Sequence, residues 1–351
     1  MRHHGSRNTL IACLVLAASL AVLSTGCLPE PYEIGAPDST LNGYVLIWQL
    51  VDQNAGTFCM RPSVDWDLVY TEFRDAAEQA ETWEEMSPVA LQMLGALQDI
   101  GLILHDDSAA LPSCDPGYFV NFDLDIWVEY MQAWGLPDTT LYLYGAGVVE
   151  PSGADSVGYL YIADLGPMYW LEQYYSVTNA VQGCSGLILD LRVCGQGGME
   201  VNARHSVGRF VSQSATAYYR TEREGTGRTD MGDTLKVTAY KNGSWQFTEP
   251  IVVLTGRGTS GTGEELALLL ATQEHVTLMG DTTAGFASES VTHDLVDGWS
   301  VSVPFQVVFD TEMVAVFDRG IPPDILVPSS EADFAAGVDP VLDAALEMLT
   351  L

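Results

Sequence analysis

The 351-residue chain is poor in positive charge: it has 14 lysine and arginine residues against 47 acidic residues, a formal net charge of −33. Nucleic-acid binding requires clustered cationic side chains that neutralise phosphates, so this composition argues against a nucleic-acid partner. Anionic membrane headgroups would also repel so acidic a chain unless an anchor held it. Hydrophobic residues make up 47% of the chain, enough to bury a sizeable core in one large or two ordinary domains.

Cysteine and histidine are scarce, with six of each, and neither type is spaced like the ligands of a zinc site. We therefore expect no metal ion and no cofactor. Beyond residue 27, four cysteines remain, which allow three disulfide connectivities. Cys184 and Cys194 flank an expected strand that spans about 30 Å when extended, so a direct bond between them is not expected. A bond between Cys59 and Cys114 stays open.

The N-terminus carries export signals. Arg2 and Arg7 precede the apolar run Leu10–Leu23, which is too short to span a bilayer and fits the hydrophobic region of a secretory signal peptide. The small residues before Cys27 resemble the cleavage site of bacterial lipoproteins, at which this cysteine becomes the lipidated first residue. We expect residues 1–26 to be a signal peptide and residues 27–40 a linker. The protein is then lipid-anchored in the cell envelope, with plain secretion and an uncleaved anchor as the alternatives.

The first part of the chain beyond the linker carries helical signals. A segment with helical periodicity runs over residues 65–80, and Ser87 with Pro88 reads as a helix cap followed by proline at the first helical position. A further helix is expected over residues 125–134, before a glycine and a proline. We interpret residues 41–135 as a helical N-terminal subdomain.

Beyond residue 135, strands and helices alternate. Gly186–Arg192 and Ile251–Leu254 are aliphatic runs of the kind that form strands buried on both faces. Each is followed by a glycine-rich turn and a helix, the first of which is expected to run toward Tyr219. The carboxyl ends of parallel strands meet at one edge of a sheet, where α/β proteins place their sites, so both turns should lie at that edge. We predict an α/β core domain over residues 136–351.

Ordered motifs in this core carry a resemblance to a known family. Four segments, Gly186–Gly198, Pro250–Gly285, Gly320–Asp324 and Gly337–Leu342, are similar to motifs of the tail-specific (C-terminal processing) serine peptidases. Trp48–Leu104 resembles the helical region of the tricorn-like, interphotoreceptor-retinoid-binding-protein-like branch. The resemblance implies a crotonase-like ββα core without the inserted PDZ domain of some relatives. It also implies extended peptides or unfolded protein C-termini as partners.

The chain departs from this family at the catalytic positions. The family's nucleophile turn reads Thr-x-Ser-Ala-x-Glu, which places Gly261 at the nucleophile position. The histidine base of the tricorn-like branch corresponds to Gly101, and the lysine base of the other branch would lie within Phe286–Ser288. The late acid of the tricorn-like branch falls near Phe317 or Asp318.

A serine hydroxyl without a base is inert, so these departures imply that nucleophilic catalysis is lost. The resemblance leaves backbone amides at Gly197, Gly198, Gly261 and Thr262 as candidate donors to a carbonyl or carboxylate oxygen. We therefore predict a peptide- or ligand-binding homologue that does not cleave. The alternative is an active serine-type peptidase, a hydrolase with a rearranged site in which Ser260 is the nucleophile.

Other candidates in the chain receive structural interpretations. His105 lies nearest in sequence to the lost base, and we expect it to be an ordinary structural histidine. Cys194 also lacks a base that could activate its thiol. We interpret Arg192, at the end of the first buried strand, as a structural ion-pair residue.

Overall fold

The computed structural model describes residues 40–106, 108–135, 144–149, 156–165, 170–195 and 200–350 of the chain. The expected signal peptide, Cys27, Gly197 and Gly198 lie outside the described residues. The described residues all belong to one compact unit. Among the helices of the described ranges, none is long and apolar enough to cross a membrane.

Three helices build the N-terminal region: α1 (Thr40–Asn54), α2 (Trp66–Gln79) and α3 (Trp83–Gly95), with a short 3₁₀ helix at Gly56–Cys59. The predicted start of α2 is confirmed, because the Asp65 side chain caps it by accepting a hydrogen bond from Leu68 N at 3.0 Å. The predicted start of α3 at Ser87 is wrong. The Thr82 hydroxyl caps that helix by accepting a hydrogen bond from Glu85 N at 3.3 Å, so α3 begins earlier and Pro88 lies inside it.

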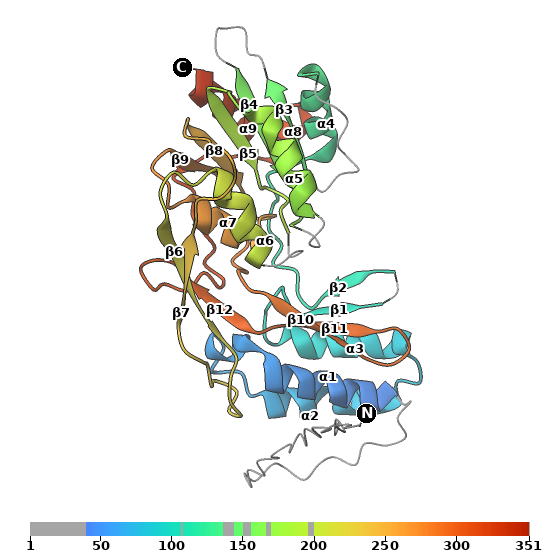
Figure 1. Ribbon diagram of the computed structural model, residues 1–351. Helices are drawn as coiled ribbons and strands as arrows, with labels where there is room; N and C mark the ends of the chain where they lie inside the picture. The colour runs from blue at the N-terminus through green and yellow to red at the C-terminus, as the bar shows by residue number, and fades with distance from the viewer. Residues whose placement is uncertain are drawn as a thin grey trace, which may run out of the picture. The chain divides into compact units, whose positions relative to one another are not determined.

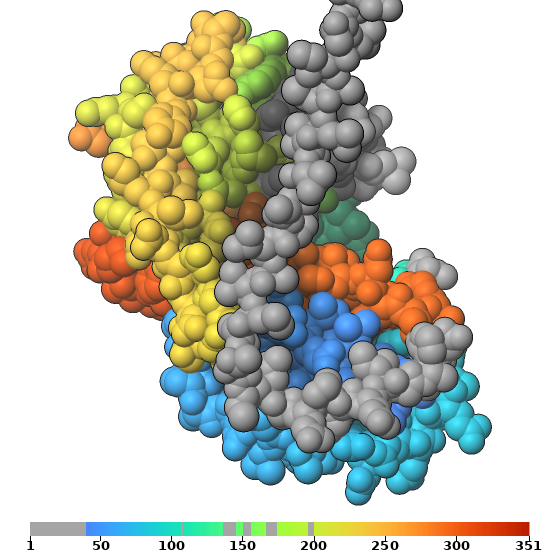
Figure 2. All heavy atoms as spheres, turned by 60° about the horizontal axis from the view of Figure 1, so that its bottom comes forward, coloured from blue at the N-terminus to red at the C-terminus, as the bar shows by residue number. Residues whose placement is uncertain are grey.

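A four-stranded antiparallel sheet, in the order β10-β11-β1-β2, packs on these helices. It pairs β1 (Ile103–His105) and β2 (Ala110–Pro112) with β10 (Ser290–Asp294) and β11 (Ser300–Pro304). Val301 and Val303 of β11 join the apolar core of the helical region. The N-terminal region therefore shares a sheet with a late segment of the chain, as the orange strands beside the blue and cyan helices show (Figures 1 and 2).

The central sheet has six strands in the order β13-β9-β8-β5-β4-β3. They are β3 (Tyr144–Val149), β4 (Val157–Ile162), β5 (Gly186–Asp190), β8 (Ile251–Thr255), β9 (Val276–Gly280) and β13 (Ile325–Leu326). All neighbours are parallel except β3 with β4. Strands β4, β5 and β8 are buried along their whole length, as predicted for β5 and β8.

Helices cover both faces of the central sheet (Figure 1). One face packs against α4 (Leu124–Ala133) and α9 (Pro340–Thr350), through a core that contains Trp127, Ile188 and Val341. The other packs against α5 (Trp170–Thr178), α6 (Glu200–Ser206) and α7 (Thr262–Leu270), around Tyr174, Leu189 and Leu266. Successive residues of β5 thus face opposite layers, and the α/β class is confirmed.

The prediction that the helix after β5 runs toward Tyr219 is wrong, because the helix is much shorter. Helix α6 ends at Ser206, a 3₁₀ turn follows at Val207–Arg209, and β6 (Ala215–Glu222) begins. β6 joins β7 (Leu235–Ala239) and β12 (Gln306–Phe309) in a third, antiparallel sheet. Between β6 and β7, Arg228 forms ion pairs with Asp52 (2.5 Å) and Asp67 (2.6 Å) of the helical region, where Figure 2 shows yellow atoms against blue. A 3₁₀ turn at Asn179–Val181 and the short α8 (Glu331–Ala335) complete the described elements.

Candidate functional site

The two glycine-rich turns that follow β5 and β8 lie side by side. The backbone amide of Ser260 donates a hydrogen bond to the carbonyl of Cys194 at 2.9 Å. The hydroxyl of the buried Thr259 donates to the carbonyl of Leu191 at 2.8 Å. Strands β5 and β8 are parallel neighbours, so both turns leave the same edge of the central sheet. This arrangement was predicted from the sequence and is confirmed.

Gly261 occupies the tight turn between β8 and α7. Its φ of +54° and ψ of −124° lie in a region that residues with a side chain rarely adopt. Serine hydrolases of other folds expose their nucleophile on a strained strand-to-helix turn of this kind. Here the position has no side chain, and its amide donates a hydrogen bond of 2.5 Å to the carbonyl of Phe286. A ligand oxygen at this amide would have to replace that bond.

Glu264 holds the loop that follows β9 in place. Its fully buried carboxylate accepts hydrogen bonds from the amides of Gly285 (2.8 Å) and Phe286 (2.7 Å) and from the hydroxyl of Thr283. Burial raises the pKa of Glu264 to about 7, and these hydrogen bonds oppose the shift. The glutamate of the Thr-x-Ser-Ala-x-Glu motif therefore supports the turn from behind and offers no free carboxylate to it.

The ring of Phe286 fills the space beside Gly101, the position that corresponds to the histidine base in the resemblance. A Cβ atom added to Gly101 would overlap the Cζ and Cε2 atoms of that ring and lie 2.8 Å from Pro304 Cγ. Phe286 is 2% exposed, so the ring is almost fully buried. It is also the first residue after Gly285, within the segment expected to carry a lysine base. One aromatic side chain thus lies at both positions where the resemblance implies a base.

Ser260 has no base among the described residues. Its side chain is buried, at 9% exposure, and within the described ranges its hydroxyl forms no hydrogen bond with a histidine, lysine or carboxylate. His105 Nε2 is instead hydrogen-bonded to Ser302 Oγ at 2.8 Å in the four-stranded sheet. Burial lowers the pKa of His105, in keeping with a neutral structural histidine.

Arg192 is the centre of a buried ion-pair network. Its guanidinium contacts Asp190 at 2.7 Å and Asp339 at 2.8 Å, and the side chains of all three residues are at most 1% exposed. Tyr159 donates a further hydrogen bond of 2.9 Å to Asp190. The network ties β4, β5 and the start of α9 together, which confirms the structural interpretation of Arg192.

The described cysteines are unpaired. Cys59, Cys114, Cys184 and Cys194 are all free thiols, so the bond left open between Cys59 and Cys114 is not formed. Cys194 is fully buried, and burial raises the pKa of its thiol. A protonated, enclosed thiol is not a substitute nucleophile.

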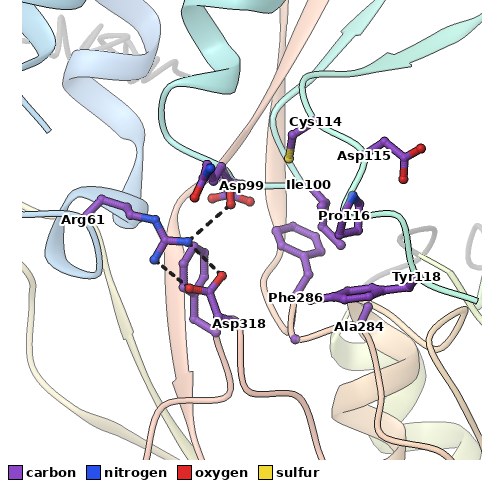
Figure 3. Close-up of a pocket in the computed structure, with 13 residues that line it drawn as sticks. Arg61, Asp99, Ile100, Cys114, Asp115, Pro116, Tyr118, Ala284, Phe286 and Asp318 are labelled. Carbon is purple, nitrogen blue, oxygen red and sulfur yellow. Dashed lines mark hydrogen bonds and ion pairs between the residues drawn. The ribbon is translucent and has the colours of Figure 1, made fainter.

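A cavity of about 280 Å³ opens beside these positions (Figure 3). Its lining comes from the helical region, from residues 114–118 and from the loops around Phe286 and Asp318. Arg61 pairs with Asp318 across it at 2.7 Å and lies 4.8 Å from the centre of the Phe317 ring. Sequence reasoning placed the late acid near Asp318 but missed Arg61, because the two residues are separated by 257 positions.

Asp99 is a buried residue that lines this cavity. Its carboxylate is 1% exposed and accepts hydrogen bonds from the Thr57 hydroxyl and, at 2.9 Å, from Gly101 N. Burial raises the pKa of Asp99 to about 6. The proposed oxyanion donors Gly197 and Gly198 lie outside the described residues, and Thr262 is the first residue of α7. That anion site stays a prediction. Within the described ranges, no group of three or more histidine, cysteine or acidic residues is placed to hold a metal ion.

The fold and the turn between β8 and α7 have the arrangement that the resemblance to serine peptidases implies. Residues 156–327 match the model of peptidase family S41. The carboxyl-terminal-processing protease of Synechocystis sp. (strain PCC 6803) is 29% identical over 199 residues, which are 56% of this chain and 44% of that protein. The match thus spans less than half of that relative. The chain is a homologue of peptidase family S41, and the resemblance to tail-specific peptidases is confirmed.

Solved structures share the fold over most of the chain. A candidate peptidase from Parabacteroides merdae has a TM-score of 0.71 and 23% identity, covering 89% of this chain and 97% of that one. Mature CPAF bound to lactacystin has a TM-score of 0.62 and 10% identity, with coverages of 89% and 97%. A lipoprotein from Streptococcus agalactiae has a TM-score of 0.58 and 14% identity, with coverages of 89% and 98%. At these identities the likeness concerns the fold alone.

Proposed function

We propose that this chain is a non-cleaving member of its family, an exported pseudopeptidase that binds extended peptides or unfolded protein C-termini at the cell envelope. Its crotonase-like core would retain the peptide-binding edge of the sheet. Thr259 and Glu264 support the nucleophile turn, whereas the nucleophile and base positions, Gly261 and Gly101, have no side chain. Catalysis by a serine needs nucleophile and base acting as a unit, so loss of both removes it.

One observation carries this proposal: the buried ring of Phe286 lies where a side chain on Gly101 would project. A glycine alone would leave an empty space that a water or a substrate group could use. The packed ring leaves no such space, so a base cannot act from this direction. Ser260, the nucleophile of the alternative, forms no hydrogen bond to a base within the described ranges.

Peptide binding is supported by what the turn still offers. The N-terminus of α7 places the positive end of the helix dipole at the turn, where it favours an anion or a polarised carbonyl, while the amides of Gly263 and Glu264 already bond to the carbonyls of Ser260 and Gly261. The amides of Gly197, Gly198 and Thr262 are the donors we assign to a peptide carbonyl or a terminal carboxylate. Gly261 joins them only if its bond to the Phe286 carbonyl opens.

The test compares cleavage with binding in the same protein. Mature wild type and Ser260→Ala are incubated with an unfolded protein and with C-terminally labelled peptides, and products are followed by mass spectrometry. We expect no turnover above background, together with peptide binding by fluorescence polarisation that Ser260→Ala leaves unchanged. Turnover by the wild type that disappears in Ser260→Ala would instead establish a serine-type peptidase with a rearranged site.

Anchoring at the membrane is a separate part of the proposal. The segment before Cys27 resembles a lipoprotein cleavage site, and a lipid anchor would hold a chain of net charge −33 at a surface that otherwise repels it. Mass spectrometry of membrane-extracted protein should find a diacylglyceryl adduct on Cys27, and Cys27→Ser should release the protein. An intact Met1 N-terminus would contradict this.

A further inference from the structure

The cavity beside Phe286 has no uncommitted cationic donor among its described lining residues. Arg61 is the only cation there, and its Nη1 and Nη2 atoms bind Asp318 at 2.7 and 2.9 Å. Its Nε donates to the carbonyl of Leu97 at 3.2 Å. A ligand carboxylate would therefore have to displace Asp318 before it could pair with Arg61.

Hydrogen-bond acceptors, in contrast, exceed the donors that the cavity supplies. Among the described residues, Asp99 accepts hydrogen bonds only from neutral donors, the Thr57 hydroxyl and the Gly101 amide, although the charge of Arg61 also acts on it. Asp115, at the exposed rim, accepts through Oδ1 from Gly117 N at 2.8 Å, and its Oδ2 bonds no described residue. A carboxylate can accept several hydrogen bonds, so both aspartates can accept more. A cationic donor can satisfy both carboxylates at once.

Aromatic side chains also line the cavity, and aromatic rings favour a bound cation. Tyr118, Phe286 and Phe317 line the cavity, and Figure 3 labels the rings of Tyr118 and Phe286. Two guanidinium groups of the chain itself already lie on such faces: Arg61 is 4.8 Å from the centre of Phe317, and Arg257 is 4.3 Å from that of Tyr118. A cation over an aromatic face is attracted by the ring quadrupole.

We propose that this cavity receives the cationic side chain, arginine or lysine, of a peptide bound by the chain. The inference rests on the proposed peptide-binding function and assigns to it a preference for basic peptides. The bound ammonium or guanidinium donates to Asp99 and Asp115 and lies against Tyr118. The cavity borders Gly285 and Phe286, next to the nucleophile turn, so one extended peptide can reach both.

The experiment uses two series of labelled octapeptides, identical except that one carries arginine and the other glutamine at each successive position. Binding to the mature protein is measured by fluorescence polarisation. At the position that enters the cavity, we expect arginine to bind about fivefold more tightly than glutamine, the combined size of one partly exposed ion pair and one cation–aromatic contact. Asp115→Asn should remove most of this preference, and Asp115→Lys should reverse it.

The control is Asp125→Asn, which removes one charge from an exposed residue of α4 that does not line the cavity. It should keep the preference, and this separates the local contact from the attraction of the whole acidic chain. Equal binding of both series would overturn the inference while peptide binding stands. A preference unchanged in Asp115→Asn and Asp115→Lys would overturn it too, because the cation then binds elsewhere. Failure of both series to bind would overturn the proposed function and the inference with it.

Discussion

The carboxylate of Glu264 accepts a hydrogen bond of 2.7 Å from the backbone amide of Phe286. This bond fixes the loop after β9 at the point from which the Phe286 ring projects against Gly101. The same hydrogen bonds therefore hold both the turn at Gly261 and the ring that packs on Gly101. On the proposed function, catalytic groups were replaced by glycine and by a packed ring, and neither change disturbs the buried hydrogen bonds around them.

Buried carboxyls should make the protein less stable as the pH rises. Burial raises the pKa of Glu264 from 4.5 to about 7 and places that of Glu265 well above its ordinary value. A carboxyl with a raised pKa binds its proton more tightly in the folded chain than in the unfolded one. The free energy of unfolding therefore falls with pH above about 4.5, by up to about 1.4 kcal/mol per pH unit for each such group. Urea unfolding at pH 5, 6, 7 and 8 measures this slope.

Glu265→Gln is the variant that isolates one group. Both Glu265 carboxylate oxygens are buried and form no hydrogen bond with any described residue, so removing the charge of Glu265 should flatten the slope and stabilise the protein at pH 8. Glu312→Gln, at an exposed position, is the matched control and should leave the slope unchanged. Equal slopes in wild type and Glu265→Gln would show that Glu265 does not titrate with folding.

The positive φ of Gly261 predicts that a side chain at this position lowers the stability of the protein. Alanine at this position must adopt a conformation that costs about 1–3 kcal/mol, so Gly261→Ala should destabilise the protein by that amount. The neighbouring Ser260→Ala should cost less than about 1 kcal/mol, because no hydrogen bond within the described ranges is lost with the hydroxyl. Chemical denaturation of both variants makes the comparison. Equal costs would mean that the turn relaxes to accept a side chain, and that restoring a nucleophile there carries no strain.

Much of the fold follows from local sequence signals. The strands β5, β8 and β9 are apolar runs buried against helices, and Asp65 caps α2 as its residue type predicts. Strand β6 was missed because its pairing with β7 shifts register between Thr216 and Tyr218, which breaks the alternation of buried and exposed residues. Propensity and period are local, so an irregular strand carries little signal of either kind.

The candidate site also has features that local sequence predicts and features that it does not. Motif spacing assigned Gly261 and Gly101 to the nucleophile and base positions, because each belongs to a short ordered segment, and that assignment stays a prediction. Motif spacing could not predict that the Phe286 ring packs on Gly101 or that Arg61 pairs with Asp318, because these contacts join residues far apart in the chain. Packing in three dimensions decides both, and both decide what the site can do.

Breaking the Arg192 network should be costly. Arg192→Ala leaves Asp190 and Asp339 as buried carboxylates without their cation, and we expect a loss of about 3–5 kcal/mol in the free energy of unfolding. Arg74→Ala is the control, because the Arg74–Glu78 pair is 39% and 44% exposed and should be worth less than about 1 kcal/mol. Similar losses in the two variants, measured by urea unfolding, would contradict a special role for the buried network.

The last prediction concerns the packing of Phe286 on Gly101. Gly101→Ala places a methyl group in space that the buried Phe286 ring occupies. The free energy of unfolding should fall by about 1–3 kcal/mol. Phe286→Ala empties that space and should cost about 3–5 kcal/mol. In the double variant the methyl group fills part of the cavity, so the combined loss should be smaller than the sum of the two by about 1 kcal/mol or more. Urea unfolding of the four proteins completes the cycle.

Gly195→Ala supplies the control for this cycle. A Cβ atom at Gly195 meets no atom within 4 Å, so its effect should add to that of Phe286→Ala without coupling. Coupling at Gly101 and none at Gly195 would establish that the ring occupies the volume of the missing base. A histidine introduced as Gly101→His could then enter only after Phe286 is reduced in size. Additive losses at Gly101 would instead mean that the ring yields freely, and the main support for a site closed to catalysis would fall.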